Sequence, residues 1–224
     1  HHTGWIRISH APEKQSLIVE FTHTLLPVLQ ILLSRLRHLF DLDARPEAIA
    51  ASLAKDPLLA PLVATRPGLR LPGAFDGFEM AVRAILGQQI TVKAATTIAG
   101  RLAEAFGEKI TTPFPELTRL APTSATVARA SLDDIASLGI IRTRSNSILA
   151  LAAAAVAGTL DLHPGSIPAD AISKLKALPG IGEWTANYIA MRALRWPDAF
   201  PKGDIVINKR LGNLTSDAAA KRSA

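Results

Sequence analysis

Apolar residues alternate with polar ones over residues 5–8 and 17–21, near the start of the chain. The two isoleucines of the first segment share one face, and Leu17, Val19 and Phe21 share one face of the second. A period of two predicts β-strands, and the short stretch between them contains a proline and charges, which predicts a hairpin. Because a lone hairpin buries too little surface to be stable, we expect it to belong to a larger α/β unit.

From residue 26 onwards the apolar spacing changes to three and four, which predicts helices. A first helix is expected over 26–40, with Leu32, Leu33 and Leu36 among its apolar positions. The stretch 56–72 contains four prolines and is expected to be a connector with short turns. Thr91 and Ser131 are expected at the N-terminal caps of two later helices. The other expected helices cover about 46–53, 78–86, 92–106, 131–139, 142–157, 168–178 and 183–195.

Composition narrows the classes of protein. Hydrophobic residues make up 48% of the chain, which is enough for a packed core, and alanine and leucine favour helices. With no cysteine, disulfides, thiolate zinc sites and cysteine-bound iron–sulfur clusters are excluded. Lys and Arg outnumber Asp and Glu by 25 to 19, which favours a polyanionic partner. There is neither an apolar run of membrane-spanning length nor a signal peptide, so we expect an intracellular, cytoplasmic protein without a membrane partner, nucleoid-associated in a bacterium.

A tight turn between two expected helices is the first stretch that indicates chemistry. Leu178 is followed by Pro-Gly-Ile-Gly, and a new helix begins at Glu183. The proline stops the first helix, and Gly180 and Gly182 permit positive φ and let a phosphate approach the bare backbone. Ile181 can plug the gap between the two helices. Amides at the next helix start would point at the anion, so the pattern favours a helix–hairpin–helix DNA grip over an ordinary turn.

An aspartate follows this turn at a distance of about 20 residues, one helix further along. That helix can bring Asp204 back beside Trp184. A glycosidic bond breaks through an oxocarbenium-like state, and a nearby carboxylate stabilises its charge and orients or deprotonates the attacking water. Taken alone, Asp204 is better interpreted as the N-cap of a helix over 205–211. Together the two stretches favour the catalytic interpretation.

These motifs carry a family likeness. Leu-Pro-Gly-Ile-Gly at 178–182 with Gly-Asp at 203–204 resembles the helix–hairpin–helix, Gly/Pro…Asp superfamily of DNA glycosylases. Within it the chain is similar to the 3-methyladenine, or alkylbase, DNA glycosylases. That likeness runs from the first hairpin to Leu214, and it is strongest over 71–73 with 83–88, 179–188 and 198–210.

The resemblance implies roles around a flipped base. Asp204 would be the catalytic carboxylate, and Trp184 and Tyr188 would line the base pocket. Gln89 would take the wedge position, where the best-known member has leucine, and would fill the space the base leaves. An indole face stacks on any base and attracts a cation by about 0.5–2 kcal/mol, which suits positively charged N-alkylated purines. The alternative is that the two aromatics, four residues apart, only pack a core.

The resemblance also implies how the turn holds DNA. Gly180, Ile181, Gly182 and Thr185 would bind phosphate. The backbone carbonyls of Leu178 and Ile181 would hold a structural monovalent cation when DNA is bound, and no other cofactor is expected. The partner would be double-stranded DNA containing damaged bases, bound by a monomer. Three alternatives are open for the chain itself: a fragment, a natural truncation, or part of a longer fusion to an alkylation-response regulator.

One position decides the type of reaction. Bifunctional relatives have a lysine at the position of Trp184, and its amine attacks the sugar to form a Schiff base. This chain would therefore use water and leave an abasic site, with Lys202 and Lys209 contacting phosphate. Two rivals remain: a glycosylase that also cleaves the strand as an abasic-site lyase, and a catalytically weak or inactive helix–hairpin–helix DNA-binding module.

The fold class that follows is mainly α, a helix–hairpin–helix DNA glycosylase fold with a partial α/β N-terminal domain. We expect that domain over 1–52 and a central helical domain with the hairpin over 77–196. Segments 53–76 and 197–224 would form a second helical domain that carries Asp204, with the active-site cleft between the two helical domains.

Overall fold

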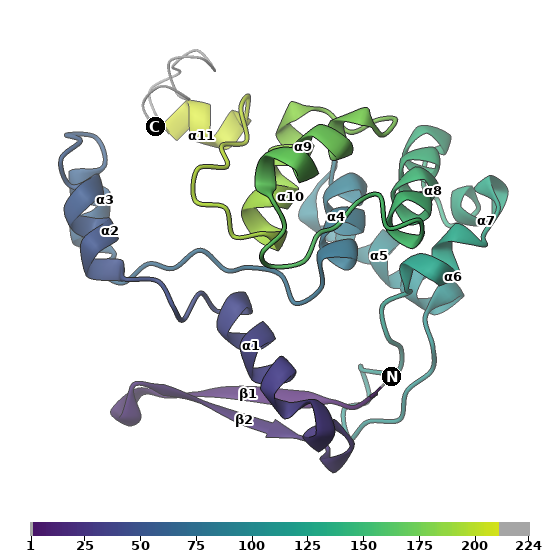
Figure 1. Ribbon diagram of the computed structural model, residues 1–224, viewed down its shortest axis with the longest axis horizontal. Coiled ribbons are helices and arrows are strands. Elements are labelled where there is room, and N and C mark those ends of the chain that lie inside the picture. The colour runs from purple at the N-terminus through teal and green to yellow at the C-terminus, as the bar shows by residue number, and fades with distance from the viewer. Residues whose placement is uncertain (1, 211–224) are drawn as a thin grey trace.

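The computed structural model describes residues 2–210 and begins with the expected hairpin, drawn in purple in Figure 1. Its two antiparallel strands are β1 (Ile6–Ala11) and β2 (Ser16–Phe21). Ile6 pairs with Phe21 and Ile8 with Val19, so these four side chains share one face, as the alternation predicted. That face packs on a small apolar cluster, which gives the hairpin the partner surface that it needs.

The small cluster is completed by the segments that follow the hairpin, the 3-10 helix η2 (His23–Val28) and α1 (Leu29–Leu39). Leu25, Leu32 and Leu36 are its buried members. The expected start of an α-helix at residue 26 is wrong, because residues 23–28 form a 3-10 helix and the α-helix begins at Leu29. Pro27 is the fifth residue of the helical segment, where it has no N–H to donate to an α-helical hydrogen bond. Leu33 is 37% exposed and lies outside the cluster, although its spacing suggested burial.

The proline-rich connector is more ordered than expected. Helix α2 (Pro46–Leu53) lies where the sequence predicted it. A further short helix, α3 (Ala60–Thr65), lies inside the stretch that was expected to hold only turns. Pro61 occupies its first turn, where a missing backbone N–H costs nothing, so this proline starts a helix rather than preventing one.

Residues 77–210 form the helical body. The predicted caps are confirmed: the Thr91 hydroxyl accepts from the Ala94 amide at 3.2 Å, and Ser131 forms a capping box with Asp134. The helices are α4 (Gly77–Leu86), α5 (Val92–Phe106), α6 (Ser124–Ala128), α7 (Leu132–Ala136), α8 (Arg142–Val156), α9 (Pro168–Ala177), α10 (Glu183–Ala193) and α11 (Ile205–Arg210).

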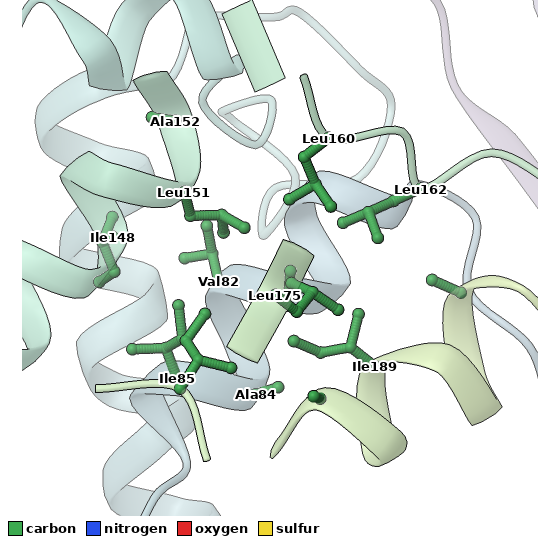
Figure 2. Packing of buried hydrophobic residues seen from close by; sticks show 14 of the residues in the cluster. Val82, Ala84, Ile85, Ile148, Leu151, Ala152, Leu160, Leu162, Leu175 and Ile189 are labelled. Carbon is green, nitrogen blue, oxygen red and sulfur yellow. The ribbon is translucent and has the colours of Figure 1, made fainter. Parts of the chain in front are cut away.

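Helix α4 forms the centre of the main core. Ile85 is completely buried, and α4 packs against α8 and α10. Figure 2 shows side chains from α4, α8, α9 and α10 meeting around Leu175. Each fully buried Leu or Ile contributes roughly 1.5–3 kcal/mol. The core therefore holds α9 and α10 firmly against α4, whose C-terminal end leads into residues 87–89.

A polar junction connects α1 and its small cluster to the end of α10. The buried His38 ring places Nε2 3.0 Å from the Ala193 carbonyl oxygen. Next to it, the Arg195 guanidinium donates to the Asp41 carboxylate, whose other oxygen accepts from the Leu71 amide at 3.2 Å. This junction fixes the end of α10, from which the chain continues towards Asp204.

Within residues 2–210, no helix combines the length and the apolar character needed to cross a membrane. The division into domains over 1–52, 77–196 and 53–76 with 197–224 stays a prediction. Residues 211–224 of its last segment, with Leu214, lie outside the described part of the chain.

Candidate active site

The turn between α9 and α10 uses the conformational freedom of one of its two glycines, because Gly182 has an extended backbone with φ −90° and not the positive φ that the sequence suggested. Gly180 has φ +74°, a left-handed value that favours glycine. A Cβ at Gly180 would also lie 2.3 Å from the Ser147 hydroxyl of α8, so the position requires glycine for two reasons. The side chain of Ile181 is 5% exposed and fills the space under the turn, as its predicted role requires.

The start of α10 presents backbone rather than side chains. Among the described residues, no side chain caps this helix at Gly182. A Cβ built at Gly182 would meet nothing within 4 Å, so open space lies beside the first amides. Uncapped amides at a helix start, reinforced by the helix dipole, form an anion site.

Asp204 and Trp184 lie together. The indole Nε1–H of Trp184 donates to Asp204 Oδ2 at 3.0 Å. The other oxygen, Oδ1, accepts from the amides of Val206 and Ile207, at 2.9 Å each, and so caps the start of α11. The two interpretations of this aspartate are therefore compatible, because the cap uses one oxygen and leaves the other facing the aromatic side chain.

Trp184 and Tyr188 form a stack on one side of α10. Their ring centroids lie 5.1 Å apart and the ring planes differ by 5°. Both residues are only partly buried, so each retains some accessible surface. Arg192, one turn further, places its guanidinium carbon 5.8 Å from the Tyr188 ring centroid. Arg192 was not predicted as a site residue, although its spacing of four from Tyr188 was the available signal.

The loop over 87–89 lies against the turn. Gln88 Nε2 donates to the Gly180 carbonyl at 3.1 Å and to the Thr185 hydroxyl at 3.0 Å. Arg144 of α8 donates to the Gln88 backbone carbonyl. Gln89, the predicted wedge residue, is exposed and has φ +55°. Gln88 and Arg144 were not predicted as site residues, because contacts across 56 to 97 positions leave no local pattern.

The side chain of Thr185 does not lie on the surface. It is 4% exposed, and its hydroxyl accepts from Gln88. The phosphate contact predicted for Thr185 remains a prediction for its backbone amide at the start of α10. The predicted cation on the carbonyls of Leu178 and Ile181 is not tested either. The Leu178 carbonyl accepts from the Ile181 amide at 3.3 Å, and a carbonyl oxygen has a second lone pair.

An acidic residue also stands at this helix start and is paired. Glu183 accepts from Lys176 of α9 through one oxygen and from Asn187 through the other, the latter at 3.0 Å. The hydrogen bond from Lys176 lowers the pKa of the Glu183 carboxyl below its ordinary value, so it is ionised at neutral pH. Lys176 thus balances a negative charge beside the candidate anion site and ties α9 to α10.

Two family models match the chain. One is described as the AlkA N-terminal domain and matches residues 1–76. The other is described as the HhH-GPD superfamily base excision DNA repair protein and matches residues 82–222, which is more than half of the chain.

Individual relatives agree with these matches. The chain is 38% identical over 205 residues to DNA-3-methyladenine glycosylase 2 of Escherichia coli, covering 90% of this chain and 69% of that protein. It is 42% identical over 182 residues to a Mycobacterium tuberculosis protein named as a probable bifunctional transcriptional activator/DNA repair enzyme, covering 80% of this chain but 36% of that one. A solved 3-methyladenine DNA-glycosylase from Archaeoglobus fulgidus has a TM-score of 0.76 at 21% identity, over 97% of this chain and 79% of that one. This last likeness shows the fold and confirms the expected fold class.

Proposed function

Because the chain belongs to the HhH-GPD superfamily of base excision DNA repair proteins, we propose that it is a DNA glycosylase that removes alkylated bases of the 3-methyladenine type. The observation that carries this proposal is the hydrogen bond between Trp184 and Asp204, which joins an aromatic surface to a carboxylate beside an anion site. Stacking surface, charge and phosphate grip are the three elements that excision of a flipped base needs.

Duplex DNA is the proposed partner. The open backbone at Gly182 and the uncapped start of α10 support phosphate binding without sequence reading. The exposed Gln89 supports a wedge that fills the place of the flipped nucleotide. A monovalent cation held by the carbonyls of Leu178 and Ile181 when DNA is bound would add positive charge beside the phosphate at this turn.

Asp204 would act on the sugar rather than on the base. As the glycosidic bond breaks, positive charge develops on the sugar, and a fixed carboxylate stabilises it. The hydrogen bonds to both oxygens fix the orientation of the carboxylate before the substrate arrives. The base would stack on the accessible surface of Trp184 and Tyr188, where a cationic alkylated purine is also attracted by the ring electrons.

The reaction would be monofunctional. The resemblance implies that Trp184 stands where lyase relatives have their lysine, and an indole cannot form a Schiff base. Water is then the nucleophile, and the product is an abasic site. Borohydride treatment during the reaction should trap no protein–DNA adduct, and a trapped adduct would instead support a combined glycosylase and lyase.

The decisive experiment compares Asp204→Asn with wild type on methylated DNA, with released bases separated by chromatography. The asparagine oxygen can keep the cap of α11, but its amide would face the Trp184 N–H, and the negative charge is lost. We expect lesion binding to persist and excision to slow by at least about a hundredfold.

The matched control is Asp76→Asn. Asp76 is also an aspartate N-cap, because its Oδ1 accepts from the Glu79 amide at 2.8 Å, but it caps α4 away from the Trp184–Asp204 pair. Its substitution should leave excision unchanged. Wild-type excision by Asp204→Asn would refute the proposed mechanism.

A further inference from the structure

Gln88 is the one described residue whose side chain joins the loop of the predicted wedge to the turn that grips phosphate. Its terminal amide uses both N–H groups, one on the Gly180 carbonyl and one on the Thr185 hydroxyl. The contacts span 92 and 97 positions of the chain. The link therefore connects the C-terminal end of α4 directly to the first turn of α10.

The loop backbone is anchored from the other side as well. Arg144 of α8 donates to the Gln88 carbonyl, and Ser147, one turn further on α8, faces the position of Gly180. Helix α8 thus contacts both the loop and the turn. Because the donor is charged, this hydrogen bond is stronger than one between neutral groups. Gln88, the residue before Gln89, is therefore held both through its side chain and through its backbone.

Gln89 itself has an unusual backbone. Its φ of +55° is uncommon for a residue with a Cβ and persists only where neighbouring contacts impose it. Among the described residues, the hydrogen bonds that hold the loop next to Gln89 are those of Gln88. In this conformation the side chain of Gln89 is exposed, while Gln88, the residue before it, is fixed to the turn.

We propose that Gln88 is a positioning residue that holds the wedge side chain of Gln89 at a fixed offset from the phosphate-gripping turn. Grip and wedge then act as one rigid unit, so that binding of a phosphate at the turn places the wedge in register with the nucleotide to be flipped. This proposal rests on the proposed function, because it assigns the wedge role to Gln89.

The first test measures the protein without DNA. The chain contains no cysteine, so Gln89→Cys provides a unique site for a nitroxide label. Adding Gln88→Met keeps the side-chain length but removes both donors. We expect the electron paramagnetic resonance spectrum of the label to show clearly faster motion. The same label at the exposed His10, through His10→Cys, should be unaffected by Gln88→Met.

The second test measures base opening and binding. Gln88→Met should reduce the fluorescence signal of an opened 2-aminopurine beside a lesion by about tenfold, the effect of losing two modest hydrogen bonds. Affinity for undamaged duplex should stay within about twofold. In a Gln89→Ala background Gln88→Met should cause no further loss of opening. The exposed Gln30, changed to alanine, is the matched glutamine control.

The outcomes separate the two proposals. An unchanged label spectrum, or losses from Gln88→Met and Gln89→Ala that simply multiply, would overturn the positioning role. Equal loss of affinity for lesion and undamaged DNA would also overturn it, since that is the result of a merely structural contact. If the wild type opens no base while the label still responds to Gln88→Met, the mechanical link stands and the proposed glycosylase function fails.

Discussion

At Asp204 the two carboxylate oxygens have different partners. Oδ1 receives two backbone amides of α11, and Oδ2 receives the Trp184 N–H. A carboxylate held in this way loses little freedom when the substrate binds, which is the condition for electrostatic preorganisation. The helix cap is therefore compatible with the proposed catalytic role of Asp204 and is not an alternative to it.

Trp184 has two roles in this arrangement, because its ring stacks on Tyr188 and its N–H donates to Asp204. Trp184→Phe should keep an aromatic ring on Tyr188 but remove the donor to Asp204. Because a hydrogen bond to a charged group contributes about 1.5–3 kcal/mol, we expect single-turnover excision to slow by about ten- to a hundredfold. Affinity for DNA carrying an abasic-site analogue should change little. Excision at the wild-type rate would mean that the N–H does not orient the carboxylate.

At the scale of elements, the hairpin contains two glycines that differ in surroundings. Gly180 has a left-handed φ and a close neighbour in Ser147, whereas Gly182 has φ −90° and open space around it. The sequence assigned the same role to both, a contact with phosphate. The structure predicts different consequences of substituting them.

Gly180→Ala should destabilise the fold by about 1–3 kcal/mol, from backbone strain and the contact with Ser147. Gly158→Ala is the control for backbone strain without a close contact, since Gly158 has φ +68° and a Cβ there would meet nothing within 4 Å.

Gly182→Ala should leave the unfolding midpoint in urea unchanged but weaken binding to damaged and undamaged duplex alike, because its methyl group would occupy the space of a phosphate. Undiminished DNA affinity of Gly182→Ala would make this an ordinary turn.

The longer elements could be predicted because their signals repeat. The alternation in the hairpin, the stripe on α4 and the caps Thr91 and Ser131 each follow from neighbouring residues. Helices α3 and α6 were not predicted, because five or six residues contain too little periodicity and depend on single residues, Pro61 and Thr123.

The candidate site divides in the same way. The aromatic stack of Trp184 and Tyr188 follows from a spacing of four on a helix, and Asp204 follows from one motif at a known distance. The bonds of Gln88 to the turn depend on how α4 packs against α10, which sequence spacing does not contain. Tertiary packing therefore determines the part of the candidate site that is proposed to position the wedge, while local sequence determines the part that is proposed to hold DNA.

At the scale of the whole molecule, the junction at His38 connects the first 76 residues to the helical body. Burial, the largest cause, lowers the pKa of the His38 imidazole below its ordinary value of 6.5. The neutral ring is therefore the native form at pH 7, and its Nε2–H donates to the Ala193 carbonyl. Nearby Arg195 also disfavours a second positive charge.

The sign of the pH dependence follows. As pH falls through 6.5, the unfolded chain binds a proton at this histidine before the folded chain does. The contribution of His38 to the free energy of unfolding is therefore fully present above pH 6.5, and it is lost as pH falls from 6.5 to the lower pKa of the folded state. In His38→Gln the amide can still donate to Ala193 but does not titrate, so urea unfolding at pH 7.5, 6.0 and 5.0 should show a weaker decline. His10→Gln, at an exposed strand position, should keep the wild-type decline. If His38→Gln and wild type lose stability in parallel, the buried imidazole is not the group that makes this junction sensitive to acid.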